Sequence, residues 1–524
     1  MTFLIEVDGV ALPDDVAAML TYARVDEDTG LPAMFTLRFG DPQHAALDKA
    51  GLRIGAEVSV RVPVPGRPAR TLTDGEVTSV EREFGPGGTT TEVRGLDATH
   101  RLQGARRVVA YLGMSVSEIV AAIAGRAGLR AVPVAETGAA ARAAWDGQLS
   151  QDDVTDWEFL LRLGELFGAR PAVVAGALRF APADDGAEPL PLAARSLLAL
   201  RATRGRPAAG AVAAHAWDLT TKRAVQATEP VPGTVGTVGG VEQRVGGVAH
   251  RPDLVRVAAE AAAARAATAV ELEGLAEGDP ALRPGVAVEL VDAGEPFEGR
   301  HVLTGVRHTF DAQAGYTTAF TVARPTPAPR PPGPVRGLVP AVVGDVRDPL
   351  GLGRVRLILP WLAPGYTTGW ARTVQPGAGP GRGALILPEV GDEVLAGFAG
   401  DDLDAPYVVG GLHNGTDPVP QLSREPVDPV SGAVAVRGFV SRHGHRVELI
   451  EDGGVLIATA GGAATVRLDS ATGAVHVSGR GVTLDAGAGD LTLRGRRVSV
   501  EAEAEAEITA NGQAVVRAAV IRLN

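Results

Sequence analysis

The chain has 524 residues, which is more than a single hydrophobic core organises, and this length predicts roughly three or four domains. Its net charge of −12 and pI of about 5.4 exclude the broad electropositive surface on which nucleic acid binds. The absence of cysteine excludes disulfide bonds, thiolate metal sites and cysteine nucleophiles.

The N-terminal sequence MTFLIEVD has neither a basic segment nor a long apolar core, so it predicts no signal peptide. No apolar run reaches the roughly 18 residues that a membrane-spanning helix requires. We therefore expect synthesis in the cytoplasm.

Two proline-rich segments divide the chain. Residues 325–334 form a semi-rigid spacer, and residues 416–430 are equally unable to form a helix. They separate three predicted parts, namely residues 1–324, 335–415 and 431–524.

The first part mixes strands and helices. Alternating apolar residues predict early strands, and Ser115 with Glu118 predicts a capping box at the start of a helix. Strands that do not alternate regularly with helices favour an α+β plan of small β-barrels with helices. The predicted strands are 58–63, 75–84, 286–291, 299–306 and 316–322, and the predicted helices are 115–124, 153–167 and 252–267.

The middle part has short strands, such as 354–359 and 383–387, with glycines at the corners. This pattern predicts a closed five-stranded barrel of the OB type.

The last part is almost entirely strand-like. Short alternating segments recur about every ten residues, and Glu501–Glu507 alternates Ala and Glu with the same period. One chain with so few large apolar residues cannot bury them alone, so it needs stacked repeats or identical chains around one axis. The segments are 455–459, 466–469, 473–478, 481–485, 490–493 and 498–500.

The middle segment resembles the OB domain of VgrG-type spikes of contractile injection systems. The resemblance rests on residues 342–361, 381–394 and 400–415. Residues 93–102, 156–163 and 316–324 resemble the hub of such spikes and of phage baseplate proteins, and 441–452 resembles the entry into a triple-stranded β-helix.

The resemblance implies a mainly β protein with an α+β hub, an OB-fold collar and a trimeric β-helical needle. It implies a homotrimer that contacts an inner tube protein and baseplate components, a PAAR-like tip protein and possible effector cargo, and transiently the target membrane. It also implies assembly in the cytoplasm and delivery as part of the particle. We expect no lysozyme domain at 416–430 and no C-terminal effector domain, and hence no enzymatic activity.

The search for chemistry yields no catalytic, cofactor-binding or metal site. His443 and His445 could offer six imidazoles to a metal in a trimer, but surface or turn histidines are the simpler interpretation. Asp97 and His100 lack a nucleophile in a suitable context, so structural hydrogen bonding is preferred. Glu501–Glu507 suits a solvated face better than a calcium site. By analogy with the family, the tip protein docks at Ala519, Ile521, Leu523 and Asn524.

Two other functions stay open. A trimeric tailspike that binds or cleaves surface glycans needs paired carboxylates in a groove, whereas the acids of residues 431–524 are scattered. A carbohydrate-binding adhesin needs aromatic platforms, and this part has only Phe439.

Overall fold

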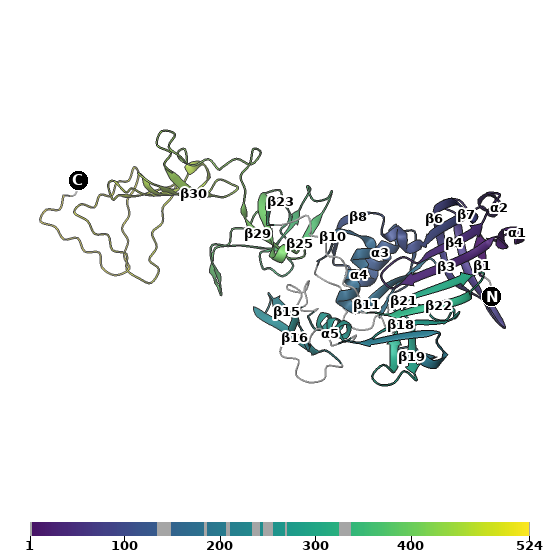
Figure 1. Ribbon diagram of the computed structural model, residues 1–524. Coiled ribbons are helices and arrows are strands. Elements are labelled where there is room, and N and C mark those ends of the chain that lie inside the picture. The colour runs from purple at the N-terminus through teal and green to yellow at the C-terminus, as the bar shows by residue number, and fades with distance from the viewer. Residues whose placement is uncertain are drawn as a thin grey trace. The chain divides into compact units, whose positions relative to one another are not determined.

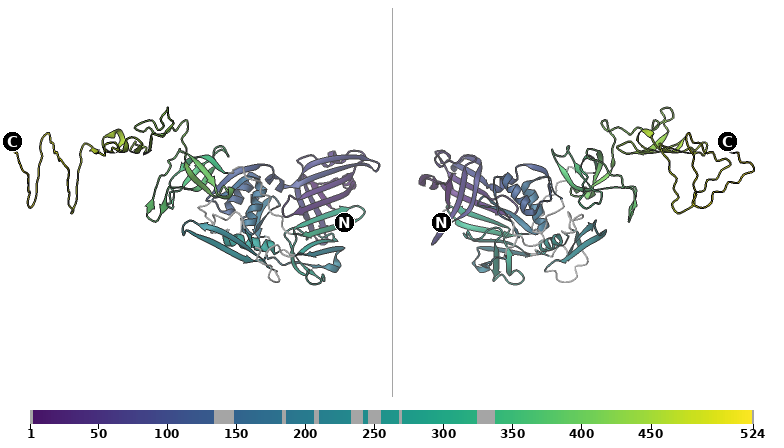
Figure 2. Two further views of the ribbon diagram at one scale, coloured as in Figure 1. Left: turned by 60° about the vertical axis from the view of Figure 1, so that its left-hand side comes forward. Right: turned by 180° about the vertical axis from the view of Figure 1, so that it is seen from behind.

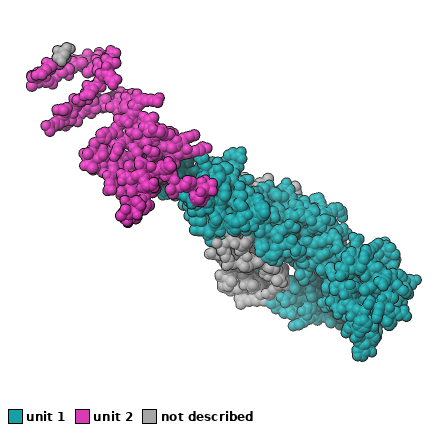
Figure 3. Space-filling model, turned by 90° about the horizontal axis from the view of Figure 1, so that it is seen from above, with its two compact units in different colours: residues 1–413 teal, residues 414–524 magenta. Residues whose placement is uncertain are grey.

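The computed structural model describes residues 3–133, 148–182, 186–205, 210–232, 242–244, 255–267, 270–323 and 337–522. The spacer predicted at 325–334 and the docking residues Leu523 and Asn524 lie outside this set. The chain divides into two compact units, residues 1–413 and 414–524, which Figure 3 colours separately. The unit boundary is close to the end predicted for the barrel at residue 415.

The first unit is built on an antiparallel sheet of eleven strands, part of which is visible in Figure 1 as β3, β4, β6 and β7. In β5 the residues Val58, Val60 and Val62 are buried while their neighbours are not, as period-two alternation predicts. Eleven strands of the hub therefore join in this one large sheet. In sheet order, the strands are β14 (Ala199–Arg204), β18 (Val270–Glu277), β22 (Gly315–Val322), β21 (Gly305–Asp311), β3 (Leu20–Asp28), β4 (Met34–Gly40), β7 (Gly88–Asp97), β6 (Arg67–Gly85), β5 (Glu57–Val64), β1 (Leu4–Val7) and β2 (Val10–Ala11).

Four small sheets complete the hub. The strand predicted at 299–306 is divided between β20 and β21, because Leu303 donates its N–H to Val286 whereas Thr304 donates to Thr321 of the large sheet. The small sheets are β8 (Arg106–Leu112) with β10 (Gln148–Thr155); β9 (Arg130–Ala131) with β11 (Ala169–Val174) and β12 (Ala177–Pro182); β13 (Leu190–Ala193) with β19 (Ala287–Val291) and β20 (Gly299–Val302); and β15 (Ala211–Asp218) with β16 (Arg223–Pro230) and β17 (Glu242–Arg244).

Capping residues mark the start of the two helices α3 and α4. Ser115 and Glu118 form the predicted capping box of α3, and Thr155 with Glu158 forms another at α4. The helix predicted from residue 153 therefore starts at Asp156, because the preceding residues pair in β10. The helices are α1 (Asp14–Ala17), α2 (Ala46–Ala50), α3 (Val116–Arg126), α4 (Asp156–Phe167) and α5 (Val255–Ala266), with short 3₁₀ turns η1 (Ala98–Leu102), η3 (Ala194–Ser196), η4 (Ala399–Asp401) and η5 (Ala460–Gly462). No helix within the described ranges is long and apolar enough to cross a membrane.

Five strands close the predicted barrel around a core that includes Val355, Leu357, Ala371 and Val394. The segment 383–387, predicted as a strand, contributes only its first residue to a small hairpin. The barrel strands are β23 (Leu338–Asp345), β24 (Val355–Ile358), β25 (Thr367–Thr373), β28 (Glu393–Phe398) and β29 (Pro406–Gly411), and the hairpin strands are β26 (Ala378–Gly379) and β27 (Arg382–Gly383).

A buried glutamine joins the hub to the barrel. Gln148 of β10, which is 3% exposed, donates from Nε2 to the Tyr366 hydroxyl at 2.8 Å and to the Leu403 carbonyl at 3.1 Å. Its Oε1 accepts from the N–H of Gly369, so one hub side chain satisfies three barrel groups. Val108 and Ala110 of β8 pack beside it against the barrel core.

The second unit is a meander in which each strand pairs with the next. The strands predicted at 455–459, 466–469 and 473–478 are confirmed, with small shifts at their ends. The strands are β30 (Val436–Val440), β31 (Arg446–Ile450), β32 (Gly454–Ala458), β33 (Thr465–Leu468) and β34 (Val475–Ser478).

Beyond β34, the strands predicted at 481–485, 490–493 and 498–500 are wrong for an isolated chain. Residues 479–522 are exposed and lie in no strand of the described chain, and Figures 1 and 2 draw them as open coil. A strand exists only where a neighbour completes its backbone hydrogen bonds, and one chain provides no neighbour here.

We expect Gln148→Ala to lower the free energy of unfolding by about 3 kcal/mol, because it leaves buried barrel groups unpaired and opens a small cavity. Urea denaturation followed by circular dichroism measures the change. Gln226→Ala is the matched control, since Gln226 is exposed and its side chain donates to the nearby Thr228. Equal midpoints for the two variants would contradict a supporting role of Gln148.

Candidate functional site

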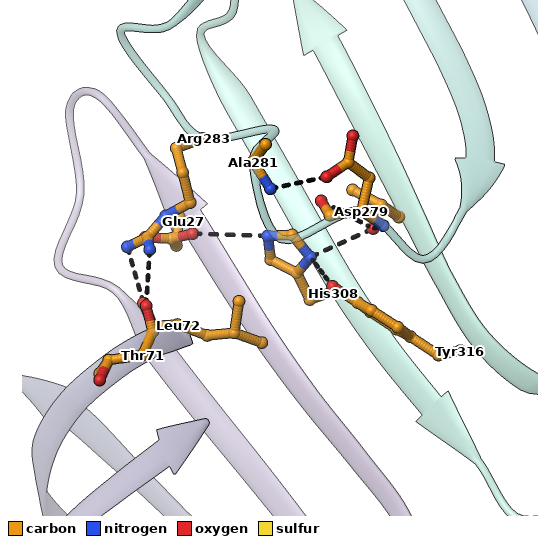
Figure 4. Close-up of polar contacts among 9 residues, drawn as sticks. Glu27, Thr71, Leu72, Asp279, Ala281, Arg283, His308 and Tyr316 are labelled. Carbon is orange, nitrogen blue, oxygen red and sulfur yellow. Dashed lines mark hydrogen bonds and ion pairs between the residues drawn. The ribbon is translucent and has the colours of Figure 1, made fainter. Parts of the chain in front are cut away.

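The hub encloses a cluster of ionisable side chains where three elements meet (Figure 4). Glu27 lies near the end of β3, His308 lies in β21, and Arg283 lies in the loop that follows β18. His308 is fully buried and the Glu27 side chain is 10% exposed. The cluster is therefore inside the protein rather than in an open cleft.

Arg283 holds the cluster to the neighbouring strand β6. Its Nε donates to Glu27 Oε1 at 3.0 Å, and its terminal nitrogens donate to the carbonyls of Thr71 at 2.9 Å and Leu72 at 2.7 Å. A guanidinium with carboxylate and carbonyl partners is a strong, directional link. Arg283 thus connects its loop to two separate strands of the large sheet.

His308 faces the other side of the cluster. Its Nδ1 lies 2.8 Å from the Tyr316 hydroxyl and 3.2 Å from Thr318 Oγ1. Its Nε2 lies 3.8 Å from Glu27 Oε2, and neither of these two buried atoms has a hydrogen-bond partner among the described residues. At this separation the two groups interact electrostatically and not through a hydrogen bond.

Burial sets the protonation of the pair. It raises the pKa of Glu27 to about 7, against the opposing effect of Arg283. Burial, together with the charge of Arg283, lowers the pKa of His308 to about 3. Burial also raises the pKa of Tyr316. The imidazole is therefore neutral over the physiological range, and the carboxyl group retains its proton far more readily than in water.

This arrangement supports structure better than catalysis. The close-up shows Glu27, Arg283 and His308 directed toward one another between strands, and the His308 side chain is fully buried. Gly278 contributes to this packing, since a Cβ there would lie 1.9 Å from the Tyr316 ring. Sequence reasoning missed the cluster. The sequence did contain one signal. His308 lies two positions from both Val306 and Phe310, so the alternation of a strand places it on the same buried face.

The structure describes both histidines that were considered as metal ligands. His443 and His445 lie in the turn between β30 and β31 rather than on a strand, and both are exposed. His445 Nδ1 accepts the N–H of Ala460 at 3.2 Å. The strand placement that would align both imidazoles is wrong, because a turn holds the two residues. Within the described ranges, no group of three or more potential ligands could hold a metal ion.

Asp97 and His100 make structural hydrogen bonds, as predicted. The Asp97 carboxylate accepts from the N–H of Thr99 at 3.0 Å and caps η1. His100 Nδ1 lies 2.6 Å from the carbonyl of Asp97, not from its carboxylate. The pair is a cap rather than an acid–base dyad.

Residues 479–522 expose many apolar side chains. Val482, Leu484, Leu491 and Leu493 are 55–66% exposed and occur at every second position of their segments. Ile521, in the proposed docking segment, is 53% exposed, and Ala519 is also exposed. These residues form a period-two apolar pattern that a single chain leaves uncovered.

Comparison with known families defines the class of the barrel. The type VI secretion system/phage-baseplate injector OB domain matches residues 339–413, which span the closed barrel from β23 to just beyond β29. A second family, the Alg8 N-terminal domain, matches residues 69–312. That span begins inside β6 and divides the eleven-stranded sheet, so it follows no structural boundary.

Curated relatives include type VI secretion system spike proteins and the actin cross-linking toxin VgrG1 of Vibrio cholerae. VgrG2a of Pseudomonas aeruginosa is 31% identical over 134 residues, covering 24% of this chain and 16% of the relative. VgrG3 of Vibrio cholerae is 30% identical over 105 residues, covering 19% of this chain and 10% of the relative. The matches thus span less than a fifth of the length of these relatives.

Solved structures extend the likeness in fold. The PdpA–VgrG complex of Francisella matches with a TM-score of 0.53 at 7% identity, covering 91% of this chain and 87% of that chain. An E. coli type VI secretion component, described as similar to phage T4 tail proteins gp27 and gp5, gives 0.50 at 19% identity, covering 78% and 99%. The barrel is thus an injector OB domain. Over most of its length the chain is similar in fold to these two structures.

The buried cluster predicts two opposing effects of pH on stability. Between pH 4.5 and 7, folded Glu27 keeps a proton that the unfolded chain releases, so the free energy of unfolding falls as pH rises. Below pH 6.5 the unfolded chain protonates His308 and the folded chain does not, so stability falls as pH drops toward about 3. The two effects oppose each other between pH 4.5 and 6.5.

Single variants separate the effects. Relative to the wild type, Glu27→Gln becomes more stable as pH rises through this window, and His308→Gln becomes more stable as pH falls, each by about 1.4 kcal/mol per pH unit. Urea denaturation at several pH values measures both slopes. Glu277→Gln, which changes an exposed carboxylate, is the control. Parallel pH curves for all four proteins would contradict the assignment.

Proposed function

We propose that the protein is the structural spike of a contractile injection system, a homotrimer that caps the inner tube and punctures the target envelope. The proposal draws on the injector OB domain at 339–413 and on the likeness to VgrG-type spikes. The observation that carries it is the alternating, uncovered surface of residues 479–522.

Interwound copies of the chain would complete the backbone hydrogen bonds of residues 479–522 and cover their apolar side chains. Each chain would offer its neighbours the missing backbone partners, and the alternating Val and Leu side chains would face a common axis. Burying each such side chain contributes about 1.5–3 kcal/mol. Ala502, Ala504 and Ala506 suit a narrower section, with the intervening glutamates directed to water.

A trimeric needle works by stiffness rather than by chemistry. Hydrogen bonds shared between chains must break together before the needle buckles, so it transmits the thrust of a contracting sheath. This role requires no catalytic residue in the chain. We propose that the particle assembles in the cytoplasm, with the hub on the inner tube protein and baseplate components. The needle carries a PAAR-like tip protein or effector cargo and crosses the target membrane transiently.

Light scattering after gel filtration tests the assembly. One chain has a mass of 53.8 kDa, so the trimer should measure about 161 kDa, three times that value. A stable, folded monomer would overturn the proposal.

Matched substitutions test the alternating surface. Leu484→Asp with Leu493→Asp places charges toward the axis and should shift the mass from trimer to monomer at micromolar concentration. Thr483→Asp with Thr492→Asp alters the opposite face and should leave the trimer intact. Equal effects of both pairs would contradict the inward placement of Leu484 and Leu493.

Truncation after Gly512 tests tip docking. The deletion removes Ala519, Ile521, Leu523 and Asn524 and should abolish co-purification of a PAAR-like protein, while the hub and barrel fold normally. Circular dichroism and solution mass report whether the truncated protein still folds and assembles. Retained tip binding at full affinity would place the docking surface elsewhere.

A further inference from the structure

The outer surface of the barrel contains a cavity of about 470 Å³ beside β25, which is labelled in Figure 1. Its lining combines two kinds of side chain. The main ones are the arginines Arg354, Arg372 and Arg382 and the leucines Leu219, Leu352 and Leu385. No lining residue is acidic.

Among the described residues, Arg354 is the one arginine of these three with an ion-pair partner. Arg354 is buried against Asp348, with Nη2 to Oδ1 at 2.6 Å, and its charge is balanced there. Arg372 lies over the Tyr407 ring at 5.8 Å, and Arg382 belongs to the β26–β27 hairpin. Neither has an acidic partner in the described part of the chain. The cavity therefore carries about two uncompensated positive charges in a protein of net charge −12.

The same outer face continues into an arginine–tryptophan stack. Val355 and Ala371 point into the core, so their neighbours Arg356 and Trp370 point outward, and the Arg356 guanidinium lies 4.7 Å from the Trp370 ring. Arg356 Nε and Trp370 Nε1 are buried and donate to no acceptor in the described chain. Buried donors are normally satisfied, so this face lacks hydrogen-bond acceptors.

The chemistry of the missing partner follows from these groups. Guanidinium groups bind carboxylates through paired N–H donors, and the exposed Leu352 and Leu385 offer apolar contacts beside them. A long polyanion would be repelled by the acidic remainder of the protein, whereas a short acidic segment would meet mainly the local positive charge. We propose that this cavity docks an extended acidic segment of a partner protein, with carboxylates on Arg372 and Arg382 and a leucine-like side chain between Leu352 and Leu385.

The proposal is independent of the needle, and its test uses the full chain in whatever assembly it forms. Fluorescence anisotropy with a labelled ten-residue peptide of alternating Leu, Asp and Glu should show saturable binding that weakens as salt rises. Arg372→Glu with Arg382→Glu should weaken binding at least tenfold. Arg130→Glu, which changes an exposed arginine elsewhere in the hub, should leave it unchanged.

Peptide variants separate the two chemical requirements. A peptide with Lys in place of the acids should not bind, and one with Ser in place of Leu should bind several-fold more weakly. The proposal is overturned if the charge-reversed protein binds the peptide normally. It is also overturned if duplex DNA binds more tightly through the same arginines, or if the charge reversal changes the solution mass without any peptide binding to the wild type.

Discussion

Backbone N–H and carbonyl groups that are buried must form hydrogen bonds, and the chain meets this requirement differently in its two units. In residues 1–413 the sheet, the small sheets and the barrel pair their strands within one chain. In residues 414–524 internal pairing stops at β34, although the alternating sequence continues. The first part thus forms its strand pairs within one chain, whereas the strand-like residues after β34 need other chains to pair with.

Within the first part, polar side chains connect elements that apolar packing alone would leave loosely oriented. Arg283 reaches two strands through its five N–H donors, and Gln148 presents both ends of its amide to the barrel. Such contacts are directional, so they fix register and angle where apolar contacts fix mainly distance. The cost is the desolvation of Glu27 and His308, which is visible in their shifted pKa values.

Local patterns in the sequence predicted local structure well. Ser115 and Glu118 located the start of α3, and the corner glycines indicated the closed barrel. Long-range features were beyond reach, because Arg283 and Glu27 are 256 positions apart and nothing in either segment indicates the other. The strands predicted beyond residue 480 had the right alternation, but periodicity describes one chain and does not say whether a partner is present. The histidines at 443 and 445 failed as an aligned pair because a turn, not a strand, holds them.

The uncovered alternation after β34 has a kinetic consequence. The strands of the hub and barrel pair within one chain, so we expect these parts to fold at a rate that does not depend on protein concentration. Ordering of residues 479–522 by other copies requires chains to meet first, so its rate rises with concentration and with anything that holds several hubs together. Once three hubs are joined, the tails are confined to a small common volume, and collision no longer limits their ordering. A surface that gathers hubs in a ring would therefore act as a template for the needle.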